Sequence, residues 1–263
     1  MLLTKEGYCP YGHKVNPRYD VEAPVYDGAQ YACFPSSFTV IAVATTGLEP
    51  DVDEIIELSA IKVVEDEVVG TFNSLVCPTI TIPAEATDYN GITNDMVKNA
   101  PRIGDIFGNY LAFLGDDVLI GQKAVFHLEF ILVNCAGLYL KEFSNDYIDT
   151  IFLAQTLLPN LSSYRLDSLT KYFDVQFDYR RRASSNTRAI LAVFHALKDK
   201  AIRQHGSVDS FMKAHNFADP LQQRTRTQSP SKSAKTTSPD TTAWIVVAIV
   251  ALVFFTLYIL ARI

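Results

Sequence analysis

The sequence predicts an α/β domain with a mixed central sheet flanked by helices, followed by one C-terminal transmembrane helix. Three observations support this architecture. Three strand-like segments come first, helix-like and strand-like segments then alternate, and a long uncharged apolar segment stands near the C-terminus. Because strands joined by short turns pair antiparallel and strands separated by helices pair parallel, the sheet should contain both kinds of pairing.

The first three strands lie in the N-terminal half of the chain. Residues 38–43 form a β-branched apolar run, and Thr-Thr-Gly at 45–47 follows it as a turn. Two further strands are expected over residues 54–63 and 68–76, because both segments are rich in β-branched residues and the acidic turn 64–67 joins them. These segments predict antiparallel hairpins at the start of the fold.

Helices and short strands alternate in the next part of the chain. Apolar residues at helical spacing predict a helix over residues 103–114, and residues 117–121 form a short buried strand. The same alternation continues with a helix over residues 126–138, a strand that ends at residues 147–148, and helices over residues 165–173 and 189–197. We therefore expect the later strands to pair parallel in the same sheet.

The C-terminal part of the chain has a composition of its own. Residues 243–261 carry no charge, and at about 1.5 Å per residue such a helix nearly crosses a hydrocarbon layer of about 30 Å. The alternative, a buried core helix, would normally be shorter or show a polar face. The segment 218–242 is rich in Ser, Thr and Pro and predicts a flexible tether, and its basic residues place the N-terminal domain on the cytoplasmic side of a single-pass membrane protein.

Charge and cysteine content argue against a non-specific nucleic-acid-binding protein and against a disulfide-stabilised one. The formal net charge is −6, and the acidic excess lies before the tether, so tight non-specific binding of nucleic acid is not expected. The four cysteines stand far apart without a C-x-x-C pair, which is typical of reduced thiols rather than a disulfide framework. Cys9, His13 and Cys33 offer three zinc ligands, but a fourth ligand is missing, and a plain N-terminal arm is the favoured interpretation.

A recognisable motif overlaps the first strand. Residues 38–48 read F-T-V-I-A-V-A-T-T-G-L. This segment resembles the first motif of the DEDDh (DnaQ-like) 3′–5′ exonucleases, in which a hydrophobic strand is followed by D-x-E-T-T-G-L. Ala42 stands where that family has its aspartate, and Ala44 stands where it has its glutamate.

Two more segments extend the resemblance in the correct order. Residues 119–131, L-I-G-Q-K-A-V-F-H-L-E-F-I, are similar to the family's L-V-G-H-N-A-x-F-D-x-x-F-L, with His127 at the aspartate position. Residues 181–194, R-R-A-S-S-N-T-R-A-I-L-A-V-F, resemble H-R-A-x-x-D-A-x-A-x-x-x-V-F. Arg181 stands for the general-base histidine and Asn186 for the last aspartate.

The resemblance implies a ribonuclease H-like exonuclease fold and a division of the chain into parts. These are an N-terminal extension (1–36), an exonuclease-like domain (37–203), a short helix with a Ser/Thr/Pro linker (204–242) and the transmembrane helix (243–261). The positions that match the family's substrate-contacting motifs are Thr45, Thr46, Gly47, Gln122, Phe126 and Arg181. They are the candidate substrate-binding residues.

The chemistry at the family's catalytic positions has changed. Such enzymes hold two Mg²⁺ or Mn²⁺ ions with several carboxylates and use a base to prepare water. This chain offers two methyl groups, an imidazole, a guanidinium and an amide, at Ala42, Ala44, His127, Arg181 and Asn186. We therefore expect no intact catalytic residue, no metal site and no cofactor.

The sequence thus predicts a pseudo-exonuclease that is tethered to a membrane and binds a nucleotide, a single-stranded nucleic acid or a protein partner. One alternative is an active metal-dependent 3′–5′ exonuclease with displaced ligands. Another is a purely structural or protein-interaction module. Engineered inactivation would explain the alanines at 42 and 44, but not the changes at His127, Arg181 and Asn186 together.

Overall fold

The computed structural model describes residues 15–16, 21–22, 25–138, 143–176 and 181–217. Within these residues a six-stranded sheet has the order β3-β8-β7-β4-β5-β6. Its strands are β3 (Gln30–Tyr31), β4 (Phe38–Thr45), β5 (Ile55–Val64), β6 (Glu67–Leu75), β7 (Leu119–Gly121) and β8 (Tyr147–Asp149). A separate antiparallel pair joins β1 (Val15–Asn16) to β2 (Val21–Glu22).

The sheet is mixed, as the sequence predicts. β4 and β5 pair antiparallel, and so do β5 and β6, whereas β7 runs parallel to β4, β8 parallel to β7, and β3 parallel to β8. The acidic turn between β5 and β6 contains Glu65 and Asp66, and both have positive φ angles of 53° and 65°. This left-handed backbone lets the turn reverse the chain within two residues.

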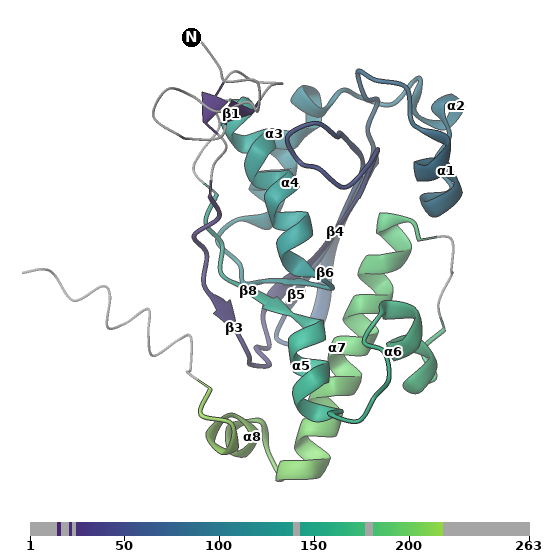
Figure 1. Ribbon diagram of the computed structural model, residues 1–263. Coiled ribbons are helices and arrows are strands. Elements are labelled where there is room, and N and C mark those ends of the chain that lie inside the picture. Colours follow the sequence, from purple (N-terminus) through teal and green to yellow (C-terminus); the bar gives the residue numbers. More distant parts are fainter. Residues whose placement is uncertain (1–14, 17–20, 23–24, 139–142, 177–180, 218–263) are drawn as a thin grey trace, which may run out of the picture. The chain divides into compact units, whose positions relative to one another are not determined.

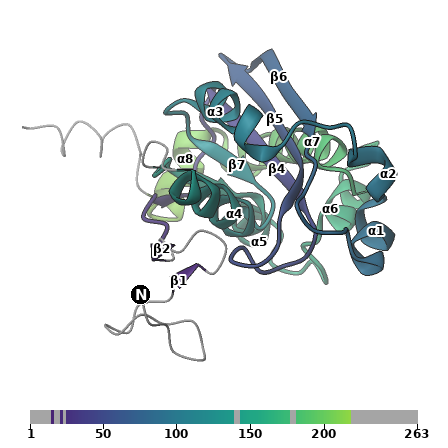
Figure 2. The ribbon, with the colours of Figure 1, turned by 90° about the horizontal axis from the view of Figure 1, so that it is seen from above.

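Helices cover both faces of the sheet (Figures 1 and 2). They are α1 (Ala84–Asn90), α2 (Asn94–Val97), α3 (Ile103–Leu114), α4 (Ala124–Gly137), α5 (Thr150–Leu157), α6 (Leu166–Tyr172), α7 (Ala183–His205) and α8 (Val208–Ala214). The side chains of β4 alternate between the two faces. Phe38 and Val40 pack in the cluster that contains the apolar residues of α5 and α7, whereas Ile41 and Val43 pack with those of α3 and α4.

The structure extends the expected elements at several places. α1, α2 and α5 were not predicted, and α7 begins at Ala183, six residues before the helix that the apolar spacing predicts. α1 has only one buried residue, Asn90, so it has no apolar stripe by which the sequence could reveal it. The first turns of α7 contain Ser184, Ser185 and Asn186, which have low helix propensity.

The segment before residue 37 contributes to the sheet and to the core. β3 adds an edge strand next to β8, and Ala32, Cys33 and Phe34 are buried in the cluster that also contains residues of α7 and α8. β3 and α8 thus lie outside the predicted boundaries of 37 and 203 but pack with the same domain. Within the part of the chain that the structure describes, no helix is long and apolar enough to span a bilayer, and the predicted transmembrane segment 243–261 lies outside that part.

Candidate functional site

The carboxyl end of β4 forms one wall of a pocket of about 600 Å³. Its other walls come from α1 and from the N-terminal ends of α4, α6 and α7. All but one of the predicted site residues line it: Ala44, Thr45, Thr46, Gly47, Gln122, Phe126, His127, Arg181 and Asn186. The exception is Ala42, which is fully buried in β4. Three motifs that are far apart in the sequence therefore meet at one pocket.

Ala42 and Ala44 lie on the face of β4 that α7 covers. In the antiparallel register Ala42 pairs with Ser59 and Ala44 with Glu57 on β5. Both methyl groups are buried, and they belong to one apolar cluster with Ala183, the first residue of α7. The start of α7 thus shares an apolar cluster with the two positions that carry alanine.

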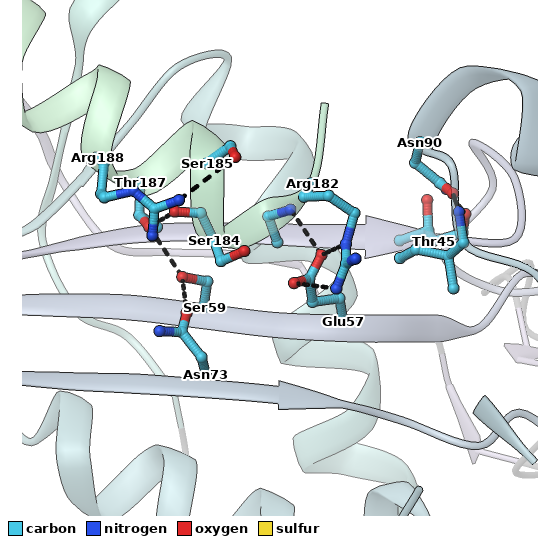
Figure 3. Close-up of polar contacts among 12 residues, drawn as sticks. Thr45, Glu57, Ser59, Asn73, Asn90, Arg182, Ser184, Ser185, Thr187 and Arg188 are labelled. Atoms are coloured by element: carbon cyan, nitrogen blue, oxygen red, sulfur yellow. Dashed lines mark hydrogen bonds and ion pairs between the residues drawn. The ribbon is translucent and has the colours of Figure 1, made fainter. Parts of the chain in front are cut away.

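Glu57 ties the start of α7 to the sheet (Figure 3). Its carboxylate accepts hydrogen bonds from Nε and Nη2 of Arg182, both at 2.9 Å, and from the backbone N–H of Ala183 at 2.8 Å. The Glu57 side chain is only 4% exposed, so the guanidinium and the positive end of the α7 dipole compensate a buried charge. Sequence reasoning missed this pair, although a carboxylate on the inward face of a strand indicates a buried partner.

A second polar contact joins α7 to β5 one turn further along the helix. The hydroxyl oxygens of Ser59 and Thr187 lie 2.8 Å apart, and Ser59 also donates to Oδ1 of Asn73 at 2.6 Å. Ser59 and Thr187 are both buried. Because buried hydroxyls require partners, this chain of hydrogen bonds helps to set the position of α7 on the sheet.

His127 takes a structural role at the second motif. Its Nδ1 accepts a hydrogen bond from the backbone N–H of Val43 at 3.2 Å, which joins α4 to β4. Burial lowers the pKa of His127 to about 4, against the opposing effect of a hydrogen bond with the Gln122 backbone. The imidazole is therefore neutral at pH 7, and since Nδ1 accepts, Nε2 carries the proton.

Gln122 lines the pocket, but its amide is engaged within the protein. Nε2 donates to the backbone carbonyl of Tyr164 at 2.6 Å, and Oε1 accepts from the Thr150 hydroxyl. The neighbouring Asp149 accepts the backbone N–H groups of Lys123, Ala124 and Ile151, so it caps both α4 and α5. Burial raises the pKa of Asp149 and these three hydrogen bonds oppose the rise. The side chains of Gln122 and Asp149 thus hold together the elements that form the pocket walls.

The Thr-Thr-Gly turn is closed by its own hydrogen bonds. The Thr45 hydroxyl donates to the carbonyl of Gly47 at 2.5 Å, and the Thr46 hydroxyl donates to Oδ1 of Asp53 at 3.0 Å. A side chain at Gly47 would place its Cβ 2.3 Å from Oδ2 of Asp53. A side chain at 47 would therefore have to displace the Asp53 carboxylate, which also accepts a hydrogen bond from the Thr46 hydroxyl, and the turn forms one edge of the pocket.

Arg181 crosses the pocket from the start of α7. Its Nη2 lies 3.2 Å from Oδ2 of Asp167 on α6, and its Cζ lies 4.5 Å from the ring centroid of Tyr89 on α1. Asn186 lines the pocket from the first turn of α7. Among the described residues no group of three or more His, Cys, Asp or Glu side chains is placed to hold a metal ion. Cys9 and His13 lie outside those residues, and Cys33 is buried in the core.

The fold and the pocket together define an α/β domain of the exonuclease type. The chain matches the sequence profile of the Exonuclease family over residues 43–194, and it belongs to this family. The predicted ribonuclease H-like exonuclease fold with a mixed sheet is thereby confirmed.

The PolC-type relatives that the chain matches are much longer proteins. The chain is similar to the PolC-type DNA polymerase III of Oceanobacillus iheyensis, with 32% identity over 216 residues that cover 78% of this chain and 15% of that protein. The PolC-type DNA polymerase III of Bacillus subtilis is 30% identical over 211 residues, which cover 78% of this chain and 15% of that protein. The chain thus spans a small part of the curated relatives that it matches.

Solved exonuclease structures share the fold. The structure of E. coli Exonuclease I in complex with a dT13 oligonucleotide is similar with a TM-score of 0.58 and 18% identity, over 65% of this chain and 42% of that one. The apo structure of an Exonuclease I is similar with a TM-score of 0.58 and 16% identity, over 73% of this chain and 47% of that one. At these identities the likeness describes the architecture alone.

Proposed function

We propose that this chain is a pseudo-exonuclease, an exonuclease-like domain that binds a nucleotide or a single-stranded nucleic acid without hydrolysing it. The observation that carries the proposal is the set of side chains at the family's catalytic positions, namely Ala42, Ala44, His127, Arg181 and Asn186. Four of them line one pocket and the fifth is buried beside it.

The donor chemistry does not fit two divalent metal ions. Mg²⁺ and Mn²⁺ prefer several oxygen ligands with negative charge, whereas these positions offer methyl groups, a neutral imidazole, a guanidinium and an amide. Glu85 on α1 is one carboxylate in the pocket lining, and the other carboxylates nearby have partners within the protein. Glu57 pairs with Arg182, Asp167 pairs with Arg181, and Asp149 accepts three backbone N–H groups. This supports a pocket without metal-dependent hydrolysis.

The pocket retains groups that suit a nucleotide. Lys123, Arg165 and Arg181 bring positive charge to its lining, and Tyr89 and Phe126 bring aromatic rings. Guanidinium groups bind phosphate oxygens through paired hydrogen bonds, and aromatic rings stack on bases. A nucleotide or a short single strand is therefore the ligand that this pocket favours.

The membrane part of the proposal rests on the sequence. The uncharged segment 243–261 would anchor the chain as a single-pass protein, and the basic linker 218–242 would keep the exonuclease-like domain at the cytoplasmic face. In that position the domain would meet nucleotides, single-stranded nucleic acids or a protein partner of the cytoplasm.

A nuclease assay on the full-length chain in detergent micelles tests the proposal. A 3′-labelled single-stranded DNA is incubated with Mg²⁺ or Mn²⁺, and E. coli Exonuclease I serves as the positive control. We expect no release of mononucleotides, together with binding of the same oligonucleotide in EDTA measured by fluorescence polarisation. Metal-dependent release would contradict the proposal, and absence of both release and binding would favour a purely structural or protein-interaction role.

A further inference from the structure

Arg181 joins opposite walls of the pocket through two contacts. The ion pair with Asp167 reaches α6 at 3.2 Å, and the cation–π contact with Tyr89 reaches α1 at 4.5 Å. All three side chains line the pocket. The guanidinium therefore already has a carboxylate partner in the place where a ligand anion would meet it.

The contact between Arg181 and Asp167 is open to exchange. The side chains of Arg181 and Asp167 are 30% and 37% exposed. They share one nitrogen–oxygen contact, whereas a bidentate arginine–carboxylate pair has two. Solvent screens ion pairs of this exposure, so they add little to stability. By contrast, Glu57 holds Arg182 with two hydrogen bonds and is 4% exposed. Of these two neighbouring arginines, Arg181 is the one that a ligand can recruit.

Charge decides which anion displaces the Asp167 carboxylate. A phosphate monoester carries about two negative charges at neutral pH, whereas a carboxylate and an internal phosphodiester carry one each. A monoester also presents three oxygens to the guanidinium fork. An internal phosphodiester therefore gains little from the exchange, whereas a terminal phosphate gains substantially.

The neighbours of Asp167 favour the same exchange. Arg165 lies two residues before Asp167 at the start of α6, lines the pocket and has no ion-pair partner among the described residues. Leu48 and Tyr89, which are 73% and 60% exposed, add uncovered apolar surface to the lining. The pocket thus offers two guanidinium groups to a phosphate and apolar contacts to a base.

We propose that Asp167 holds Arg181 as an internal competitor, and that the pocket selects nucleotides with a terminal phosphate monoester over internal phosphodiesters. The inference rests on the proposed function and names the ligand class of the same pocket. Asp167 and Arg181 are its specificity-determining residues.

Calorimetric titration of the full-length chain in EDTA tests this selection with three probes. Thymidine 5′-monophosphate has a base and a terminal phosphate, the dinucleotide TpT has bases and only an internal phosphodiester, and inorganic phosphate has no base. We expect thymidine 5′-monophosphate to bind about tenfold more tightly than either other probe. Equal affinity for TpT would overturn the monoester selection, and equal affinity for inorganic phosphate would overturn the assignment of a nucleotide.

Two variants and a control separate the roles of the side chains. Asp167→Asn keeps the shape and removes the competitor, so the affinity for thymidine 5′-monophosphate should rise about threefold. Arg181→Gln should abolish the preference for the monoester over TpT. The control Asp66→Asn breaks the ion pair between Asp66, which is 47% exposed, and Lys198, which lies in α7 well past its first turn. It should leave the affinity for all three probes unchanged.

The outcomes distinguish this inference from the proposed function. If the wild-type chain binds none of the three probes and no single-stranded DNA, the proposed function itself fails. If the wild-type chain binds nucleotides but Asp167→Asn leaves the affinity unchanged, only the competition between Asp167 and the ligand is refuted.

Discussion

His127 illustrates how a side chain that lines the pocket can also join two elements of the fold. Its imidazole lines the pocket, yet its Nδ1 is bound to the N–H of Val43 and burial keeps it neutral. A neutral ring buried in this way stabilises the folded state only while it stays unprotonated. The burial that keeps the imidazole neutral also makes the stability of the domain sensitive to acid.

The sign of this pH dependence follows from the lowered pKa. The unfolded chain protonates His127 below its usual pKa of 6.5, whereas the folded state does so only near 4, so stability falls as pH falls between these values. Between pH 7 and pH 5 we expect His127 to contribute a loss of about 2 kcal/mol in the free energy of unfolding. Urea unfolding at both pH values checks this, with His127→Gln as the comparison. Equal pH slopes for the two chains would refute it.

Tyr110 is a second residue with a separable effect. Its ring is fully buried between Phe72 and Phe107, at centroid distances of 5.2 and 6.1 Å, and its hydroxyl has no partner among the described residues. Because this buried hydroxyl makes no hydrogen bond, its removal breaks no favourable interaction. Tyr110→Phe should therefore leave the free energy of unfolding unchanged or raise it by about 1 kcal/mol. In Tyr164→Phe, where the hydroxyl donates to the carbonyl of Leu158 at 2.6 Å, about 1 kcal/mol should be lost instead.

At the scale of elements, the start of α7 depends on a buried ion pair. Glu57 receives two hydrogen bonds from Arg182, the N-cap residue of α7, and one from Ala183, its first residue. Ala42, Ala44 and Ala183 share an apolar cluster in this region and contribute only methyl groups to it. Glu57 therefore helps to fix the start of α7, and with it the place of Arg181 and Asn186, while the Ser59–Thr187 contact and the apolar residues of α7 hold the rest of the helix on the sheet.

Glu57→Gln tests this dependence. The substitution leaves the Arg182 guanidinium without its counter-charge, so the free energy of unfolding should fall by about 3 kcal/mol. Chemical denaturation of Glu57→Gln, Arg182→Gln and the double variant measures the coupling between the two residues. The pair of Lys198 and Asp66, whose side chains are 21% and 47% exposed, provides the control, because its carboxylate is far less buried than that of Glu57, and Asp66→Asn should lose less than about 1 kcal/mol. A loss of equal size in both pairs would argue against a special role for Glu57.

The elements that sequence periodicity predicts are those with an apolar pattern of sufficient length. β5, β6 and α3 lie within two residues of their predicted bounds. β5 and α3 contain buried core residues, whereas β6 contributes partly buried side chains such as Phe72. α5 was missed because β8 runs into it without a loop, with Asp149 serving as both strand end and helix cap. A short apolar run of that kind does not distinguish a helix from a buried strand.

At the scale of the whole molecule, the sequence identifies which positions meet but not what they contact. The three motifs assign Ala44, His127 and Asn186 to one predicted site, and all three line the same pocket. The partners of the charged residues were not predictable, since Glu57 and Arg182 are 125 residues apart and lie on different elements. Ion pairs of that kind depend on the packed fold and leave no local pattern in the sequence.

The packing of the whole domain also determines what happens when carboxylates are introduced at positions 42 and 44. Ala42 and Ala44 are buried, and Ala44 lies opposite Glu57 in the sheet. The carboxylate of Glu57 already has Arg182 as its counter-charge. In Ala42→Asp/Ala44→Glu two more negative charges would be buried without a cation, so at about pH 7 the free energy of unfolding should fall by at least about 3 kcal/mol. The loss should be smaller at about pH 5, since buried carboxylic acids protonate there and the charges disappear.

The control Ala42→Asn/Ala44→Gln has nearly the same size and no charge, and urea denaturation of both variants at the two pH values separates the effect of charge from the effect of size. Equal losses that do not change with pH would mean that size, rather than charge, excludes acids from these positions.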